Sequence, residues 1–139
     1  MEQRAGHRSV PHTADLRVEA WGPGREECLT EAVRGVVEAF ADIGGAQAVR
    51  DRESTVRGER DEDLLVALLD EVVYQLDTKG EIPVEVRLNA VPGGVRALFR
   101  TADIGTVPLI GAAPKAVTLH GLAIGRGADG WSCAVTLDV

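Results

Sequence analysis

The sequence contains little cysteine, few aromatic residues and fewer basic than acidic residues. Of its 139 residues two are cysteines and 4% are aromatic. Neither Cys28 nor Cys133 has a second cysteine or a histidine at metal-ligand spacing, so we expect two reduced, buried thiols. Lys and Arg total 15 against 22 Asp and Glu, which gives a formal net charge of -7. An acidic chain is poorly suited to bind nucleic acid by itself and better suited to a cation or a protein partner.

Long hydrophobic runs are also absent. The longest apolar runs fall well short of the roughly 20 residues of a membrane-spanning helix, and residues 1–8 have no apolar signal-peptide core. We therefore expect a soluble, cytoplasmic protein without membrane contact. With 45% hydrophobic residues, the chain is long enough for one substantial core. Residues 1–139 are predicted to form a single domain.

Two segments have apolar residues at helical spacing. From Cys28 to Ala41 they recur on one continuous helical face, after acidic residues at 26–27 that suit a helix N-terminus. From Leu64 to Leu76 the same spacing follows the acidic triplet 61–63. The triplet could be a ligand cluster, but an acidic first helical turn explains it better.

The other segments alternate or are bounded by turn residues, which is typical of strands. The predicted strands cover residues 16–21, 46–59, 83–91, 95–101, 116–125 and 131–139. Two helices among consecutive strands predict the α+β class, with two amphipathic helices packed on a mainly antiparallel sheet of about six strands.

Two aspartates stand at strand ends near opposite extremities of the chain. Alternation places Asp15 on the face opposite Leu16, and Asp138 on the face opposite Leu137. If the fold brings them together, they form with Val139, at which the sequence ends, an all-oxygen site of the kind hard divalent cations prefer. The ordinary alternative is a pair of solvent-facing aspartates on a one-sided sheet.

Other candidate residues have weaker signals. His12 precedes the first predicted strand, where a histidine can cap or hydrogen-bond as well as bind a metal. Lys115 and His120 lie near a strand that has no nucleophile motif, and the chain has no nucleophile elbow, P-loop or zincin helix. A metal-dependent hydrolase would need a general base and a cleft that the sequence does not specify. The residues alone therefore specify no catalytic set.

Several segments together resemble the archease family over nearly the whole chain. They are HTADLRVEAWG at 12–22, the Glu-Glu helix start at 26–27, DLLVALLDEVVYQLDT at 63–78, KAVTLHGL at 115–122 and LDV at 137–139. The resemblance implies an archease-like fold and a small protein cofactor of the tRNA-splicing RNA ligase that is not an enzyme itself. Such a cofactor promotes guanylylation of a ligase histidine and multiple turnover in tRNA processing, and it contacts RNA only indirectly.

The resemblance also implies a site. The metal ligands would be Asp15, Asp138 and Val139, with calcium as the favoured ion and magnesium or manganese as alternatives. Lys115 would take part in activation or partner contact, as would His12. We expect a monomer that binds the ligase.

Two departures from the family pattern bear on the partner. Leu119 replaces a tyrosine that is usual in the family, and the loop 106–114 is uncharged where the family's is commonly charged. The alternative function is a chaperone-like or scaffold module that binds proteins without any dependence on the ligase.

Overall fold

The computed structural model describes residues 4–11 and 15–139. The described chain forms seven strands, two α-helices and a single 3₁₀ turn. In chain order these are β1 (Gly6–Pro11), β2 (Asp15–Gly22), α1 (Arg25–Phe40), β3 (Arg50–Arg57), α2 (Asp61–Lys79), β4 (Glu81–Val91), β5 (Gly94–Asp103), η1 (Ile104–Thr106), β6 (Ala116–Arg126) and β7 (Trp131–Asp138).

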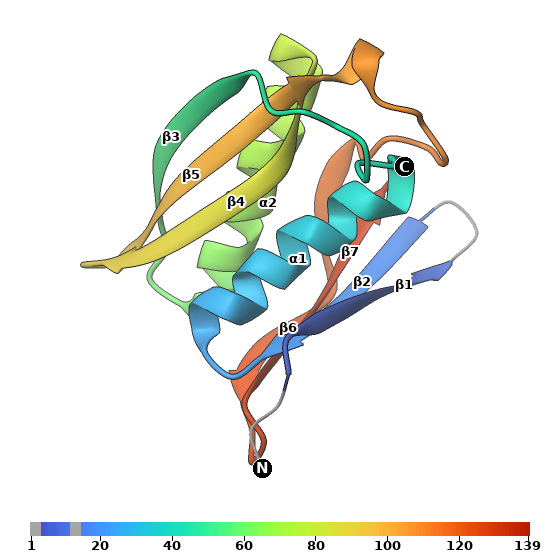
Figure 1. Cartoon of the computed structure of the whole chain (residues 1–139). Helices are drawn as coiled ribbons and strands as arrows, with labels where there is room; N and C mark the ends of the chain where they lie inside the picture. The colour runs from blue at the N-terminus through green and yellow to red at the C-terminus, as the bar shows by residue number, and fades with distance from the viewer. Residues whose placement is uncertain (1–3, 12–14) are drawn as a thin grey trace.

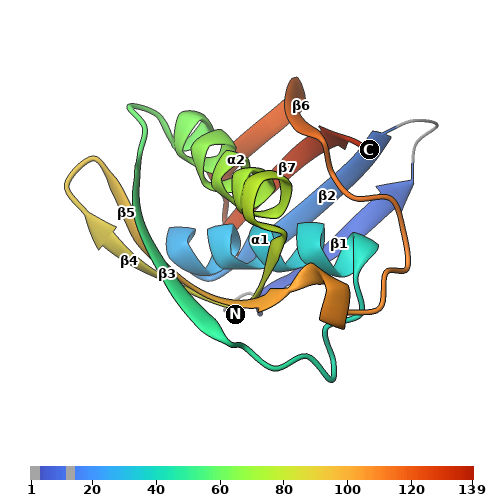
Figure 2. The same ribbon diagram turned by 90° about the horizontal axis from the view of Figure 1, so that it is seen from above.

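The strands form two antiparallel sheets with the helices between them (Figures 1 and 2). One sheet has the strand order β1-β2-β7-β6 and the other has the order β3-β5-β4. Helix α1 contacts β2 and β1 of the first sheet and β4 of the second, and α2 contacts β6, β4 and β3. The predicted α+β class with two helices on antiparallel sheet is confirmed. The strand number is slightly higher than the predicted six, because β1 was not expected.

Local sequence explains where the helices begin and end. The carboxylate of Asp63 accepts the main-chain N–H of Arg60 at 3.3 Å, which satisfies a free donor at the start of α2. Gly80 ends α2 with φ of 61° and donates its N–H to the Leu76 carbonyl at 3.1 Å. The acidic triplet that includes Asp63 is therefore a helix start, as the sequence indicated.

The hydrophobic core lies on the helix-facing sides of both sheets. Large side chains that are almost fully buried come from both helices and from both sheets; among them are Phe40, Leu68, Phe99 and Leu137. Both helices thus share one core with both sheets, which fixes the sheets relative to each other. Among the described residues, neither helix has a stretch long and apolar enough to span a lipid bilayer.

The first sheet has helices on only one of its faces (Figure 2). Its inner face carries Val18, Val135 and Leu137, all with no exposed surface. Strand alternation therefore puts Asp15 and Asp138 on the outer face. This outer face positions the candidate site.

Candidate metal and partner-binding site

The structure brings Asp15 and Asp138 together. In the β2–β7 pair they are register partners, directly opposite each other, and the next pair along is Leu16 with Leu137. Residues directly opposite in an antiparallel pair project from the same face with Cβ atoms about 4.5–5.5 Å apart. The two carboxylates therefore stand side by side at one end of the outer face.

No cation of the described chain neutralises this pair. Within residues 4–11 and 15–139, neither the Asp15 nor the Asp138 carboxylate makes an ion pair or a side-chain hydrogen bond. Two unpaired carboxylates so close repel each other, and a divalent cation with oxygen ligands would offset that repulsion. The pair fits a hard cation for this reason.

The pair alone does not complete a coordination sphere. In the described part of the chain, no three His, Cys, Asp or Glu side chains are grouped so that they could hold a metal ion. Further ligands would have to be main-chain oxygens, such as those near Val139, or water. Hard cations accept such ligands readily.

Lys115 and Val139 lie at the same end of the sheet. The Lys115 N–H donates to the Asp138 carbonyl at 2.8 Å, and Ala116 is the register partner of Asp138. Both Lys115 and Val139 line a cavity of about 640 Å³, together with Asp77 of α2. The Lys115 side chain is exposed and thus accessible to a partner. His12, the remaining candidate, lies outside the described residues.

A second hollow adjoins Asp15 on the outer face. It measures about 310 Å³ and is lined by Asp15, Arg17, His120, Gly121 and Thr136. Sequence alternation places Arg17 on the face of Asp15, and Thr136 on the face of Asp138, but neither was a candidate. His120 was noted only as lying near a strand that has no nucleophile motif, and nothing in the local sequence indicates that His120 lies near Arg17 of β2.

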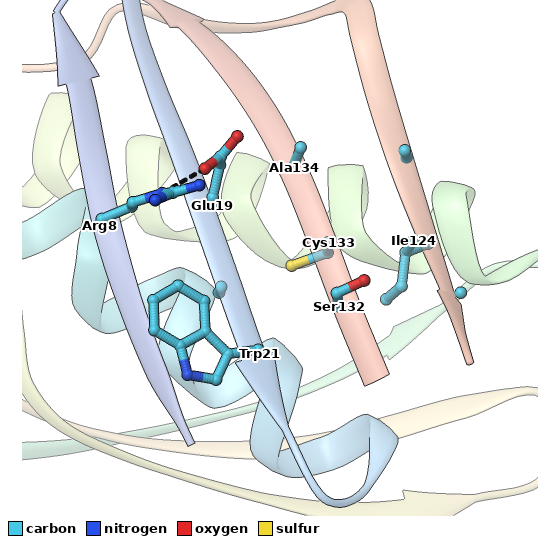
Figure 3. Close-up of a pocket in the computed structure, with 10 residues that line it drawn as sticks. Arg8, Glu19, Trp21, Ile124, Ser132, Cys133 and Ala134 are labelled. Carbon is cyan, nitrogen blue, oxygen red and sulfur yellow. Dashed lines mark hydrogen bonds and ion pairs between the residues drawn. The ribbon is translucent and has the colours of Figure 1, made fainter. Parts of the chain in front are cut away.

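A third hollow of about 560 Å³ opens further along the same face (Figure 3). The Trp21 indole and the Arg8–Glu19 ion pair lie on one side of it and Ile124 on the other, with the small Ser132 between them (Figure 3). The hydrogen bond from Arg8 holds the pKa of Glu19 below its usual value. Apart from the Arg8–Glu19 ion pair and Ser132, the lining is largely apolar.

The Archease protein family model matches residues 7–139, which includes every described candidate residue. The chain belongs to the archease family. A Mycobacterium tuberculosis relative named "probable protein archease" is 56% identical over 135 residues, which are 97% of this chain and 75% of the relative. The "protein archease" of Archaeoglobus fulgidus is 27% identical over 135 residues, covering 96% of this chain and 98% of that one.

Solved archease structures agree with the fold. The crystal structure of an archease from Thermotoga maritima, described as a possible chaperone, superposes with a TM-score of 0.68 at 25% identity and covers 94% of each chain. The solution structure of protein 1598 of Methanobacterium thermoautotrophicum superposes with a TM-score of 0.72 at 23% identity. It covers 96% of this chain and 99% of that one, and at this identity it supports the fold alone.

Proposed function

We propose that this archease-family chain is a protein cofactor of the tRNA-splicing RNA ligase and not a catalyst itself. It promotes guanylylation of the ligase and multiple turnover by means of a divalent-metal site at Asp15 and Asp138. The observation that carries the proposal is the register pairing of these two aspartates with no neutralising cation among the described residues. Calcium is the favoured ion, with magnesium and manganese as alternatives.

The chain's own residues have distinct roles in this proposal. Asp15 and Asp138 hold the ion from adjacent strands, and the main chain at Val139 adds oxygen. A bound divalent cation would stabilise negative charge on phosphoryl oxygens during guanylyl transfer. Lys115 stands next to Asp138 through its N–H bond and extends its exposed ammonium toward a ligase carboxylate or a phosphate. The net charge of -7 suits a protein partner, with RNA contacted only indirectly.

The uncharged loop 106–114 adds an apolar contact near this end of the molecule. The Ile110 N–H donates to the Phe40 carbonyl at 2.9 Å, which fixes the loop on the end of α1. The side chains of Leu109 and Ile110 are nevertheless 57% and 65% exposed. The loop thus offers the ligase a hydrophobic surface in place of the charged one that is common in the family.

The test is multiple-turnover RNA ligation by the ligase of the same organism, with and without this protein. Wild type should increase the number of turnovers, and both Asp15→Asn and Asp138→Asn should lose most of this stimulation because each leaves one carboxylate. Asp129→Asn is the matched control, since Asp129 lies in the exposed β6–β7 turn away from the pair. Equal stimulation by wild type and both site variants would refute the metal role. No stimulation by wild type would refute the ligase role.

The alternative is a chaperone-like or scaffold module, and the Thermotoga protein is described as a possible chaperone. The exposed Leu109 and Ile110 favour it, because exposed apolar side chains can hold unfolded segments. This function predicts suppression of aggregation of an unrelated thermally unfolded protein, lost in a Leu109→Ser/Ile110→Ser variant and unchanged in Asp138→Asn.

A further inference from the structure

We propose that the hollow beside Asp15 binds a phosphate group, held by Arg17, His120 and Thr136 next to the metal ion. The proposal rests on the metal site of the proposed function and adds a ligand and three residues to it. The phosphate is a monoester of the kind carried by a nucleotide, which agrees with RNA being contacted only indirectly.

An irregularity in β6 forms the hollow. Thr118 of β6 pairs with Thr136 of β7, but the next β6 residue in register is Ala123, which pairs with Ala134. β6 therefore holds several more residues than β7 over this stretch, and they bulge away from the ladder. Gly121 sits in the bulge with φ of 67°, a backbone conformation that side chains other than glycine rarely adopt.

The bulge reaches toward β2 across β7. The Arg17 guanidinium donates from Nη1 to the Gly121 carbonyl at 3.4 Å, although the two residues are far apart in sequence. A Cβ atom on Gly121 would lie 2.8 Å from the same nitrogen. The glycine is thus required both by the backbone conformation and by the close approach of Arg17.

Thr136 contributes a hydroxyl to the hollow. It projects from the outer face of the sheet, opposite Arg17, and it is 5% exposed. A threonine hydroxyl can both donate and accept, so it can hydrogen-bond a phosphate oxygen from this position.

The charges of the hollow determine the kind of ligand. Arg17 and His120 provide donors for an anion, and a guanidinium binds phosphate oxygens well. Asp15 lines the same hollow, so an anion alone would meet an unpaired carboxylate. A divalent cation on Asp15 and Asp138 would reverse this repulsion. Phosphate should therefore bind only when the metal site is filled.

The size of the hollow limits the ligand to a small group. Its volume of about 310 Å³ is at the low end of the roughly 300–1,000 Å³ of small-molecule sites. It accommodates a phosphate group but leaves little room for a nucleotide base. The base would extend out of the hollow toward solvent or the partner protein.

The experiment is isothermal titration calorimetry on the full chain. The protein is first titrated with Mg²⁺ and then, at saturating Mg²⁺, with inorganic phosphate, with GMP and with a trinucleotide RNA that ends in a 3′-phosphate. Guanosine, which has no phosphate, is the ligand control. The phosphate titration is repeated in EDTA, and circular dichroism verifies that each variant is folded.

The chain supplies a matched control for Arg17. Arg8 and Arg17 both contact the carboxylate of Glu19 from the same sheet face, but only Arg17 lines the hollow. Phosphate binding should weaken about tenfold in each of three variants of the hollow, Arg17→Gln, Thr136→Val and His120→Gln. Each substitution removes one hydrogen bond to the phosphate. Arg8→Gln makes the same charge change and should leave phosphate affinity unchanged.

The outcomes separate this inference from the proposed function. Binding of phosphate in Mg²⁺ but not in EDTA, weakened by the three hollow variants alone, would support the inference. Mg²⁺ binding without phosphate binding would overturn the inference and leave the metal site standing. Equal losses in Arg8→Gln and Arg17→Gln would also overturn it, since a diffuse charge effect would then suffice. Tighter binding of GMP or of the RNA would identify the source of the phosphate.

Discussion

The opposed carboxylates of Asp15 and Asp138 make a prediction about stability that needs no partner protein. Replacing one of them by its neutral isostere, as in Asp138→Asn, should stabilise the metal-free protein because it removes the repulsion. Two unit charges about 5 Å apart in bulk water repel by about 0.8 kcal/mol. Favourable cross-strand pairs contribute about 0.2–1 kcal/mol, and like charges directly opposite are destabilising. Salt screens part of this repulsion, so about 0.5 kcal/mol is expected.

The effect on thermal unfolding is small without metal and reverses with metal. For a domain of this size, 0.5 kcal/mol corresponds to a rise in Tm of roughly 2 °C. A divalent cation at a hundred times its Kd stabilises a folded protein by about 2.7 kcal/mol, which is a rise of roughly 10 °C. Wild type should show this larger rise, and Asp138→Asn should lose most of it. The variant would thus be the more stable protein in EDTA and the less stable one in metal.

The assay is thermal unfolding followed by circular dichroism, in EDTA and in millimolar Ca²⁺, Mg²⁺ or Mn²⁺. Asp129→Asn controls for the change in net charge and should behave as wild type. Destabilisation by Asp138→Asn in EDTA would show that the carboxylate has a partner and is not repelled. An unchanged metal-induced rise in Asp138→Asn would show that the ion binds elsewhere.

Three further predictions concern the buried framework. Glu81→Gln should lower the free energy of unfolding at pH 7 and make it fall less between pH 4.5 and pH 2. The hydrogen bonds from Arg52 at 2.9 and 2.7 Å lower the pKa of Glu81 from 4.5 to about 2. The stabilisation by the Glu81 carboxylate is therefore complete above about pH 4.5 and is lost as the pH falls toward 2, which urea unfolding at several pH values would measure. Gly94→Ala should cost more than about 2 kcal/mol in chemical denaturation, since its Cβ would lie 2.0 Å from a main-chain oxygen of β3. Hydrogen bonding to the Cys28 thiol and burial raise the pKa of Cys133, so its reaction with a disulfide reagent should be slow until the protein unfolds.

The first two of these predictions have matched controls. Glu53→Gln alters an ion pair with Arg96 that is largely exposed, and it should change stability and its pH dependence little. Gly45→Ala adds a Cβ with no atom within 4 Å and should be neutral. Equal effects of test and control variants would contradict the first two predictions. Rapid labelling of both thiols in the native protein would contradict the third.

The helices and the acidic pair could be predicted because each has a local signal. Helical spacing of apolar residues marks α1 and α2, and the acidic first turns mark their starts. Alternation in single strands put Asp15 and Asp138 on the faces opposite their apolar neighbours. Their direct opposition follows from the β2–β7 register, which depends on long-range pairing that alternation within a single strand does not specify.

Other features have no local signal. Strand β1 consists of GHRSVP, which has too few apolar residues to alternate; it forms because β2 provides an edge to pair with. The division into two sheets was not predicted, because it depends on how α1 and α2 pack between them. The β6 bulge was not predicted either. Between Thr118 and Ala123, where the register shifts, Gly121 is the residue that could have indicated an interruption of the strand pairing.

Strand order has a consequence for how the protein is made. β7 is the last strand of the chain, yet it lies between β2 and β6 in the first sheet. During synthesis, β2 and β6 therefore leave the ribosome before the strand that joins them, and each exposes an unpaired edge until β7 follows. A chain that stops before Trp131 can assemble neither this sheet nor the Asp15–Asp138 pair. A chain without β7 would therefore also lack the metal site of the proposed function.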